Sequence, residues 1–272
     1  GPPPKGRRRG GGAPDVVSSS AMLVAVLLSS SAVMSRRAVM QFAPAAALPF
    51  SALSPGPVFA AAGDDPRAAL LLLLAASPAN DDAAVAAAME RLVPLDPSRG
   101  AAATSAALGG RWRLLWSANA DAFSPLLNLP PPLRPESLQL LGSAAESAGC
   151  GTGRIAQLLD FPLPFFPVLR LTSSARPDPD DPRTLEIFPP FRLETLPAGS
   201  GGSGGGRTLV ESGSDAGFRA VNARTAEAQA APRNRYEISY LEESGRPGDL
   251  RISRVVAGDP VIVGSVFLHQ RL

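Results

Sequence analysis

The sequence predicts a mainly β protein, an antiparallel barrel or sandwich preceded by a short N-terminal helical segment. Beyond residue 108, short apolar runs alternate with Pro- and Gly-rich turns, which is typical of barrels and sandwiches. The run 108–117, LGGRWRLLWS, shows period-two alternation and contains both tryptophans of the chain. Residues 66–99, in contrast, have apolar residues at helical spacing.

Residues 1–62 form a basic leader. They contain six Lys and Arg residues against one Asp, whereas residues 63–272 contain 20 basic and 23 acidic residues. The stretch 1–20 has the composition of a transit peptide, and an apolar run follows at 21–28. Arg36 and Arg37, an apolar stretch and three alanines at 60–62 are typical of a twin-arginine signal, although basic leaders often contain such pairs. We expect removal of this leader, and the near-neutral remainder gives no charge argument for nucleic acid.

Two helices are expected between residues 66 and 96. The first is Ala- and Leu-rich and is interrupted at Ser77-Pro78, and the second begins with Asn80 or Asp81 as its N-cap. Its apolar residues recur at helical spacing until Pro94 and Pro97 end it. We therefore expect residues 66–99 to form a helical lead-in packed outside the barrel.

Residues 108–268 are expected to form one antiparallel barrel. In its first strand, Trp112, Leu114 and Trp116 share one face by period-two alternation. A flexible insertion is expected at about 199–232, where Gly and Ser are frequent. The further strands are expected at 137–141, 154–160, 166–173, 184–188, 191–196, 207–211, 236–242, 249–255 and 261–268.

The apolar faces of these strands either line a cavity for an apolar ligand or fill the barrel interior. In the C-terminal strands, alternation groups Ile238 with Tyr240, Leu250 with Ile252, and Phe267 with the apolar residues before it. The candidates for lining a lipid cavity are Trp112, Leu114, Trp116, Ile238, Tyr240, Leu250, Ile252 and Phe267.

Polar residues of strand 249–255 are the best candidates for a polar site. Asp249 and Arg251 lie on the face opposite Leu250, whereas Arg254 shares the Leu250 face and must leave at the strand end or lie at a barrel opening. Surface salt bridges are the simpler account of all three residues.

Three phenylalanines among prolines form a second candidate surface. They can form an exposed apolar lip that touches a lipid surface, and they are Phe161, Phe165 and Phe166.

Signals for catalysis or cofactor binding are weak. The stretch 151–156 matches G-x-G-x-x-A but lacks the strand before it and the helix after it that a dinucleotide site requires. His269 is the single histidine and is expected as an ordinary strand residue. Cys150 is the single cysteine, which excludes intrachain disulfides and thiolate metal clusters. We expect no catalytic site, no metal site and no cofactor.

The C-terminal motifs resemble those of the plastid lipid-associated proteins, or fibrillins. The segments YEISYLE at 236–242, DLRISR at 249–254 and the apolar strand 261–268 are similar to the closing strands of that family. GRWRLLWS at 110–117 resembles its opening strand, and GRIAQLLD at 153–160 resembles its next anchor. Glu242 stands where the family usually has Asp.

This resemblance implies a lipocalin-like barrel that binds or coats apolar lipids without catalysis. The ligands it implies are carotenoids, prenylquinones or galactolipids, at thylakoids or plastoglobules, and the Arg36-Arg37 signal would direct the protein to the thylakoid lumen. The mature chain would be peripheral to the membrane rather than transmembrane. The alternative is a scaffold module with a filled barrel that binds a partner enzyme of plastid prenylquinone metabolism.

Overall fold

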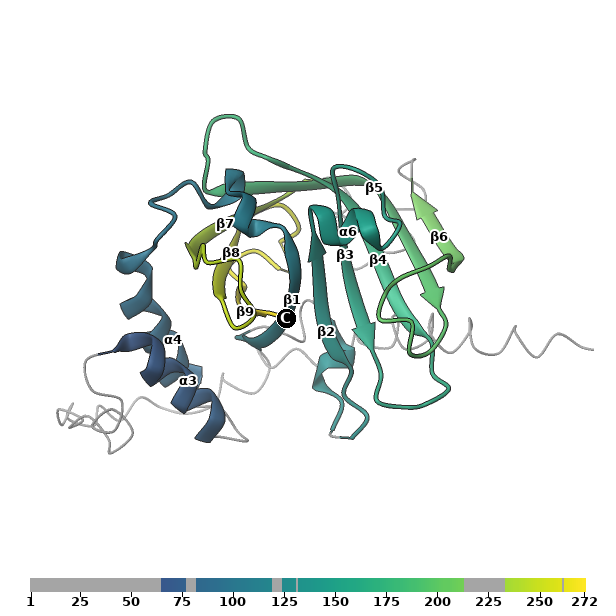
Figure 1. Cartoon of the computed structure of the whole chain (residues 1–272), viewed down its shortest axis with the longest axis horizontal. Helices are drawn as coiled ribbons and strands as arrows, with labels where there is room; N and C mark the ends of the chain where they lie inside the picture. The colour runs from purple at the N-terminus through teal and green to yellow at the C-terminus, as the bar shows by residue number, and fades with distance from the viewer. Residues whose placement is uncertain (1–64, 77–81, 119–123, 131, 213–232, 261) are drawn as a thin grey trace, which may run out of the picture. The chain divides into compact units, whose positions relative to one another are not determined.

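The computed structural model describes residues 65–76, 82–118, 124–130, 132–212, 233–260 and 262–272 (Figure 1). The predicted leader and the larger part of the predicted insertion lie outside these residues. The helices and 3-10 turns are α3 (Pro66–Ala76), α4 (Asp82–Leu92), η3 (Val93–Leu95), η4 (Ala102–Thr104), η5 (Ala106–Leu108), η6 (Pro125–Asn128) and α6 (Ser143–Ser147). The strands are β1 (Gly110–Ser117), β2 (Glu136–Leu141), β3 (Arg154–Asp160), β4 (Val168–Pro177), β5 (Thr184–Leu196), β6 (Arg207–Ser212), β7 (Asn234–Leu241), β8 (Leu250–Ala257) and β9 (Val266–Arg271).

The nine strands form one antiparallel sheet in the order β4-β3-β2-β1-β9-β8-β7-β5-β6. Because β4 also pairs with β5, the hydrogen bonding closes into a ring through every strand except β6. The long strand β5 makes this closure possible. Its first half pairs with β7 and its second half with β6, while β4 follows it along both halves. The prediction of a mainly β, antiparallel fold is therefore confirmed.

The two ends of the ring differ. At one end, which we call the closed end, Gly110 pairs with Leu141 and the turns η4 and η5 lead into β1. At the opposite end, which we call the loop end, Glu136 of β2 pairs with Asp160 of β3, and the segments before β2 and between β3 and β4 extend beyond the strands (Figure 1). This distinction locates both candidate sites described below.

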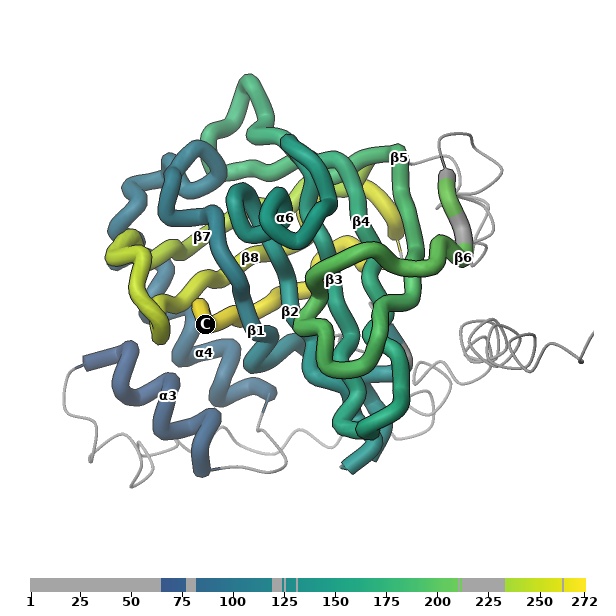
Figure 2. Tube along the Cα trace, turned by 45° about the vertical axis from the view of Figure 1, so that its right-hand side comes forward, coloured from purple at the N-terminus to yellow at the C-terminus, as the bar shows by residue number. Residues whose placement is uncertain are grey.

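Helices α3 and α4 cover the outer face of β1, β7, β8 and β9. Their apolar side chains pack against Trp116, Tyr240, Leu250, Ile252 and Leu268. Both views show the two helices beside these strands (Figures 1 and 2). Helices α3 and α4 therefore lie outside the strand ring.

An ion pair fixes α3 to the sheet. Arg67 donates from Nε to Glu242 Oε1 at 2.6 Å, and Glu242 Oε2 accepts the backbone N–H of Leu250 at 2.8 Å. The hydroxyl of Tyr240 also donates to Glu242 Oε1 at 3.0 Å. One carboxylate therefore joins the helix to β7 and β8.

The outer face of β2, β3 and β4 is covered by α6 and by the Gly- and Ser-rich loop after β5. Arg170 of β4 is buried and pairs with Glu194 of β5 at 2.9 Å. Its guanidinium also donates to the carbonyls of Ala148 and Gly202, at 2.8 and 3.0 Å. The described first part of the predicted flexible insertion therefore packs on the sheet. It is held there because the buried guanidinium of Arg170 hydrogen-bonds to the buried carbonyl group of Gly202.

Most strand bounds differ from the predicted ones by up to four residues, and two differences are larger. The expected strands 184–188 and 191–196 are one continuous strand, β5, although Pro189 and Pro190 lie in its middle. Proline is tolerated there because neither residue is among those paired with β6 or β7. The last strand begins at Val266 rather than 261 and continues to Arg271.

No helix in the described part of the chain is both long and apolar enough to cross a membrane.

Candidate functional site

A cavity lies inside the strand ring and is partly open to solvent. Seven of the eight ring strands contribute to its wall, β4 being the exception. The polar half of the lining consists of Ser137, Gln139, Gln157, Arg251, Ser253 and His269. The apolar half consists of Leu114, Leu185, Ile187, Tyr236, Ile238 and Phe267. Such a lining suits a ligand that has both polar and apolar parts.

The cavity is small. Its volume is about 30 Å³, enough for about two or three waters. Pockets that bury small-molecule ligands are usually about 300–1,000 Å³ in size. The ring interior in this structure therefore has no room for a carotenoid or a prenylquinone.

Arg251 is the charged group of the cavity wall. Its side chain on β8 is only 3% exposed, and it donates from Nη2 to Gln139 Oε1 at 2.5 Å, while its Nε has no hydrogen-bond partner among the described residues. Burial, together with the charge of Arg271, lowers the pKa of Arg251 to about 9. A guanidinium with so depressed a pKa lacks the compensation that a buried cation ordinarily has.

His269 lies beside this guanidinium. The two residues are directly paired in the β8–β9 register. Burial, reinforced by the charge of Arg251, holds the pKa of His269 well below its usual value, so the ring is neutral near pH 7. Its Nδ1 has no hydrogen-bond partner among the described residues. His269 therefore offers a neutral polar group to the cavity and no balancing charge.

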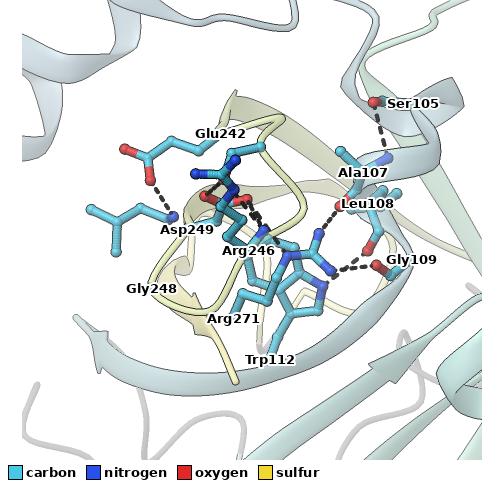
Figure 3. Close-up of polar contacts among 12 residues, drawn as sticks. Ser105, Ala107, Leu108, Gly109, Trp112, Glu242, Arg246, Gly248, Asp249 and Arg271 are labelled. Carbon is cyan, nitrogen blue, oxygen red and sulfur yellow. Dashed lines mark hydrogen bonds and ion pairs between the residues drawn. The ribbon is translucent and has the colours of Figure 1, made fainter.

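Trp112 fills the closed end of the ring (Figure 3). Its ring is fully buried, and Nε1 donates to the carbonyl of Leu108 at 2.9 Å. The guanidinium of Arg271 lies over the indole at 4.4 Å, and that of Arg251 at 4.8 Å. Arg271 in turn donates to the carbonyls of Ala107 and Gly109. The indole is therefore a buried core side chain that stacks against two guanidinium groups, and it does not line the cavity.

Asp249 completes this closed end. Its carboxylate lies 3.7 Å from Nε of Arg271 and accepts a hydrogen bond from the N–H of Arg246 at 3.2 Å (Figure 3). It also accepts a hydrogen bond from the hydroxyl of Ser244 at 2.5 Å. Asp249 and Arg251 share a face, as predicted, but Asp249 compensates Arg271 rather than Arg251.

A β-bulge separates the two tryptophans onto opposite faces. Leu114 pairs with His269 and Trp116 with Leu268, so β1 has one residue more than β9 at this point. The extra residue moves Trp116 to the outer face, where Nε1 donates to Asp82 of α4 at 3.0 Å. The prediction that Trp112 and Trp116 share a face is therefore wrong, and only Leu114 of this strand lines the cavity.

A second bulge has the same effect in β7. Ile238 pairs with Ser253 and Tyr240 with Ile252, so Ile238 lines the cavity while Tyr240 faces α3 and α4. Leu250 and Ile252 share a face as predicted, but this face packs against the helices. Tyr240, Leu250 and Ile252 are thus corrected from cavity candidates to outer-core residues.

Of the remaining candidates, Phe267 lines the cavity and Arg254 lies on the surface. Arg254 is half exposed and approaches Glu90 of α4 at 3.3 Å, a surface ion pair of the kind expected.

The loop end carries the exposed aromatic residue. Phe165, between β3 and β4, is 94% exposed, whereas Phe161 and Phe166 contact each other with ring centroids 4.4 Å apart. Leu163 in the same loop and Leu133 in the segment before β2 are also exposed, at 38% and 42%. Phe165 is thus the most exposed member of the predicted lip, Phe161 and Phe166 are partly exposed, and the two leucines add to the exposed apolar surface.

Sequence reasoning missed the polar wall of the cavity. Ser137 and Gln139 alternate with Leu138 and Leu140 in β2, which is the signal that could have placed them on the inner face. This signal was overlooked because apolar residues were expected to face the inside of the barrel.

Groups suited to catalysis or metal binding do not gather here. Cys150 is buried under α6, and burial raises the pKa of its thiol. Within the described ranges, no three His, Cys, Asp or Glu side chains are placed to hold a metal ion.

Comparison of the chain with protein-family models found no match, and comparisons with curated proteins and with solved structures found none either.

Proposed function

We propose that this protein is a non-catalytic, peripheral plastid lipid-associated protein of the fibrillin type, with a lipocalin-like barrel. The motifs at 110–117, 153–160, 236–242 and 249–254, which resemble that family, support the proposal. The strand ring, with its helices on the outer face, is compatible with such a barrel. The basic leader supports plastid import, with thylakoids or plastoglobules as the destination.

The observation that carries the proposal is the exposed apolar surface at the loop end. Phe165 presents nearly its whole ring to solvent, and Leu163 and Leu133 are exposed in the same loop and in the segment before β2. These residues lie at the same end of the sheet because Glu136 pairs with Asp160. Burying a phenylalanine side chain contributes about 1.5–3 kcal/mol, so insertion of this lip gives reversible attachment.

Surface contact fits the structure better than carriage of a large lipid inside the ring. The cavity of about 30 Å³ cannot hold a carotenoid or prenylquinone. The same observation favours the second candidate, a scaffold module with a filled ring that binds a partner enzyme of prenylquinone metabolism. The two differ in whether the lip contacts lipid or protein.

Flotation with galactolipid vesicles distinguishes them. We expect the full chain to float with the vesicles and Phe165→Ser to reduce the partition coefficient by about 10- to 100-fold. Leu95→Ser is the matched control, because Leu95 is 58% exposed but lies in η3, away from the loop end. A wild-type chain that stays with the soluble fraction, or equal loss in both variants, would contradict lipid contact and leave the scaffold function.

A further inference from the structure

Arg251 differs from the other buried arginines of the described chain. Arg170 pairs with Glu194 at 2.9 Å, and Arg271 lies 3.7 Å from Asp249. Arg251 is as deeply buried but has no carboxylate partner among the described residues. The amide of Gln139 and the indole of Trp112 contact its guanidinium, but neither carries a negative charge. A buried cation without a counter-charge is costly, so an anion that neutralises Arg251 would come from outside the described side chains.

The lining defines the charge of that missing partner. Arg251 is the single cation of the cavity wall, and His269 is neutral because burial depresses its pKa. One uncompensated positive charge matches one negative charge. Gln139, Gln157 and the hydroxyl groups of Ser137 and Ser253 add neutral hydrogen-bonding groups around it. A singly charged oxygen anion fits this wall better than a dianionic phosphate.

The size of the cavity and the apolar half of its lining restrict the class of anion further. A volume of about 30 Å³ holds about two or three water-sized groups, which corresponds to the two oxygens of a carboxylate and little more. Leu114, Ile238 and Phe267 line the wall beside the polar groups, since Leu114 pairs with His269 and both Ile238 and Phe267 pair with Ser253. A carboxylate attached to an alkyl chain would satisfy both halves, with the chain leaving through the open side of the cavity.

We propose that the cavity inside the strand ring is a binding site for the carboxylate end of a fatty acid, with Arg251 as the group that pairs with it. The guanidinium donates to the carboxylate oxygens, the amide of Gln139 keeps the guanidinium oriented, and the alkyl chain leaves through the open side of the cavity. This inference rests on the proposed function only in assigning lipid chemistry to the ligand. It requires no attachment to a membrane.

Calorimetric titration of the full chain with dodecanoate and with dodecan-1-ol tests the proposal. The alcohol has the same chain without the charge, so we expect dodecanoate to bind about 10- to 100-fold more tightly, the range for a hydrogen bond to a charged group. Acetate and hexanoate separate a free small carboxylate from an acyl chain, and we expect hexanoate to bind more tightly than acetate. Equal affinities for acetate and dodecanoate would overturn the fatty-acid assignment.

Arg251→Gln is expected to remove the preference for dodecanoate over dodecan-1-ol. Arg254→Gln is the matched control, because Arg254 lies on the same strand but is half exposed and paired with Glu90. We expect it to leave both affinities unchanged. Dodecanoate affinity that survives in Arg251→Gln, or falls equally in both variants, would overturn the role of Arg251.

A measurement on the unaltered protein guards against misfolding of Arg251→Gln. The carboxyl carbon of ¹³C-labelled dodecanoate reports its own ionisation by NMR, and pairing with Arg251 should keep the bound group ionised at a lower pH than the free acid. A bound carboxyl that titrates like the free acid, or at higher pH, would overturn the proposal. Flotation of the Phe165→Ser variant is independent of this result, so failure of membrane contact and failure of carboxylate binding are distinguishable.

Discussion

Replacing Trp112 by alanine is expected to destabilise the closed end of the ring through packing alone. The indole is fully buried, donates to the carbonyl of Leu108, and supports two guanidinium groups at 4.4 and 4.8 Å. Trp→Ala replacements in cores cost about 3–5 kcal/mol, and the loss of the two cation–π contacts favours the upper part of that range. Since domains are stable by about 5–15 kcal/mol, the variant should still fold.

Urea unfolding provides the measurement. Trp116 is the one other tryptophan of the chain, so its fluorescence reports unfolding in Trp112→Ala without interference. Trp112→Phe is the control, because it keeps an aromatic ring beneath the guanidinium groups and loses the hydrogen bond, at a cost of about 1–2 kcal/mol. A loss below about 1 kcal/mol for Trp112→Ala would refute the assignment of Trp112 as a buried core side chain.

Three further predictions concern other parts of the ring. Gly202→Ala should lower the free energy of unfolding by about 1–3 kcal/mol, because the added Cβ would lie 2.2 Å from Leu158 Cδ1. Gly204→Ala is the control, because Gly204 has a similar positive φ but open space around it, and it should cost less. Equal losses of stability in thermal or urea unfolding would contradict the packing of Gly202 against Leu158. Glu194→Ala should cost about 3–5 kcal/mol by leaving the buried Arg170 unpaired, whereas a loss under about 1 kcal/mol would show that water compensates the guanidinium. His269 takes up a proton in the unfolded chain but not in the folded protein, because its pKa is lowered in the fold. Acidification from about pH 6.5 to pH 5 should therefore destabilise the wild-type protein more than His269→Asn. The difference should be up to about 1.4 kcal/mol per pH unit. The same pH dependence of stability in the wild-type protein and in His269→Asn would disprove this prediction.

Local patterning predicted the strands but not which way their side chains point. Alternation located the first strand correctly, and it also placed Trp112 and Leu114 on one face. Trp116 departs because the bulge near Leu115 adds one residue against β9, and one added residue reverses every following side chain. Bulges depend on the partner strand, so a single strand's sequence does not reveal them.

The candidate site was misjudged for a related reason. Leu250 and Ile252 share a face, and the choice between inner and outer depends on what covers each face. Helices α3 and α4 supply a large apolar surface outside the ring, so the apolar face of β8 turns outward. Arg251 and Ser253 then face inward, where a sequence argument expects hydrocarbon. The helical lead-in was predicted, but its effect on the sheet's orientation follows only from tertiary packing.

Mass spectrometry of lipids extracted from the purified protein would show which class of lipid the strand ring holds. The ring encloses a small cavity whose one cation has no carboxylate partner among the described residues, and we propose that large apolar lipids meet the protein at its loop end. We therefore expect that acyl carboxylates co-purify with the wild-type chain and are depleted in Arg251→Gln, while carotenoids and prenylquinones are washed away with the membrane. A carotenoid or prenylquinone retained at about one molecule per chain after detergent washing would require an interior far larger than this one. That result would contradict the account.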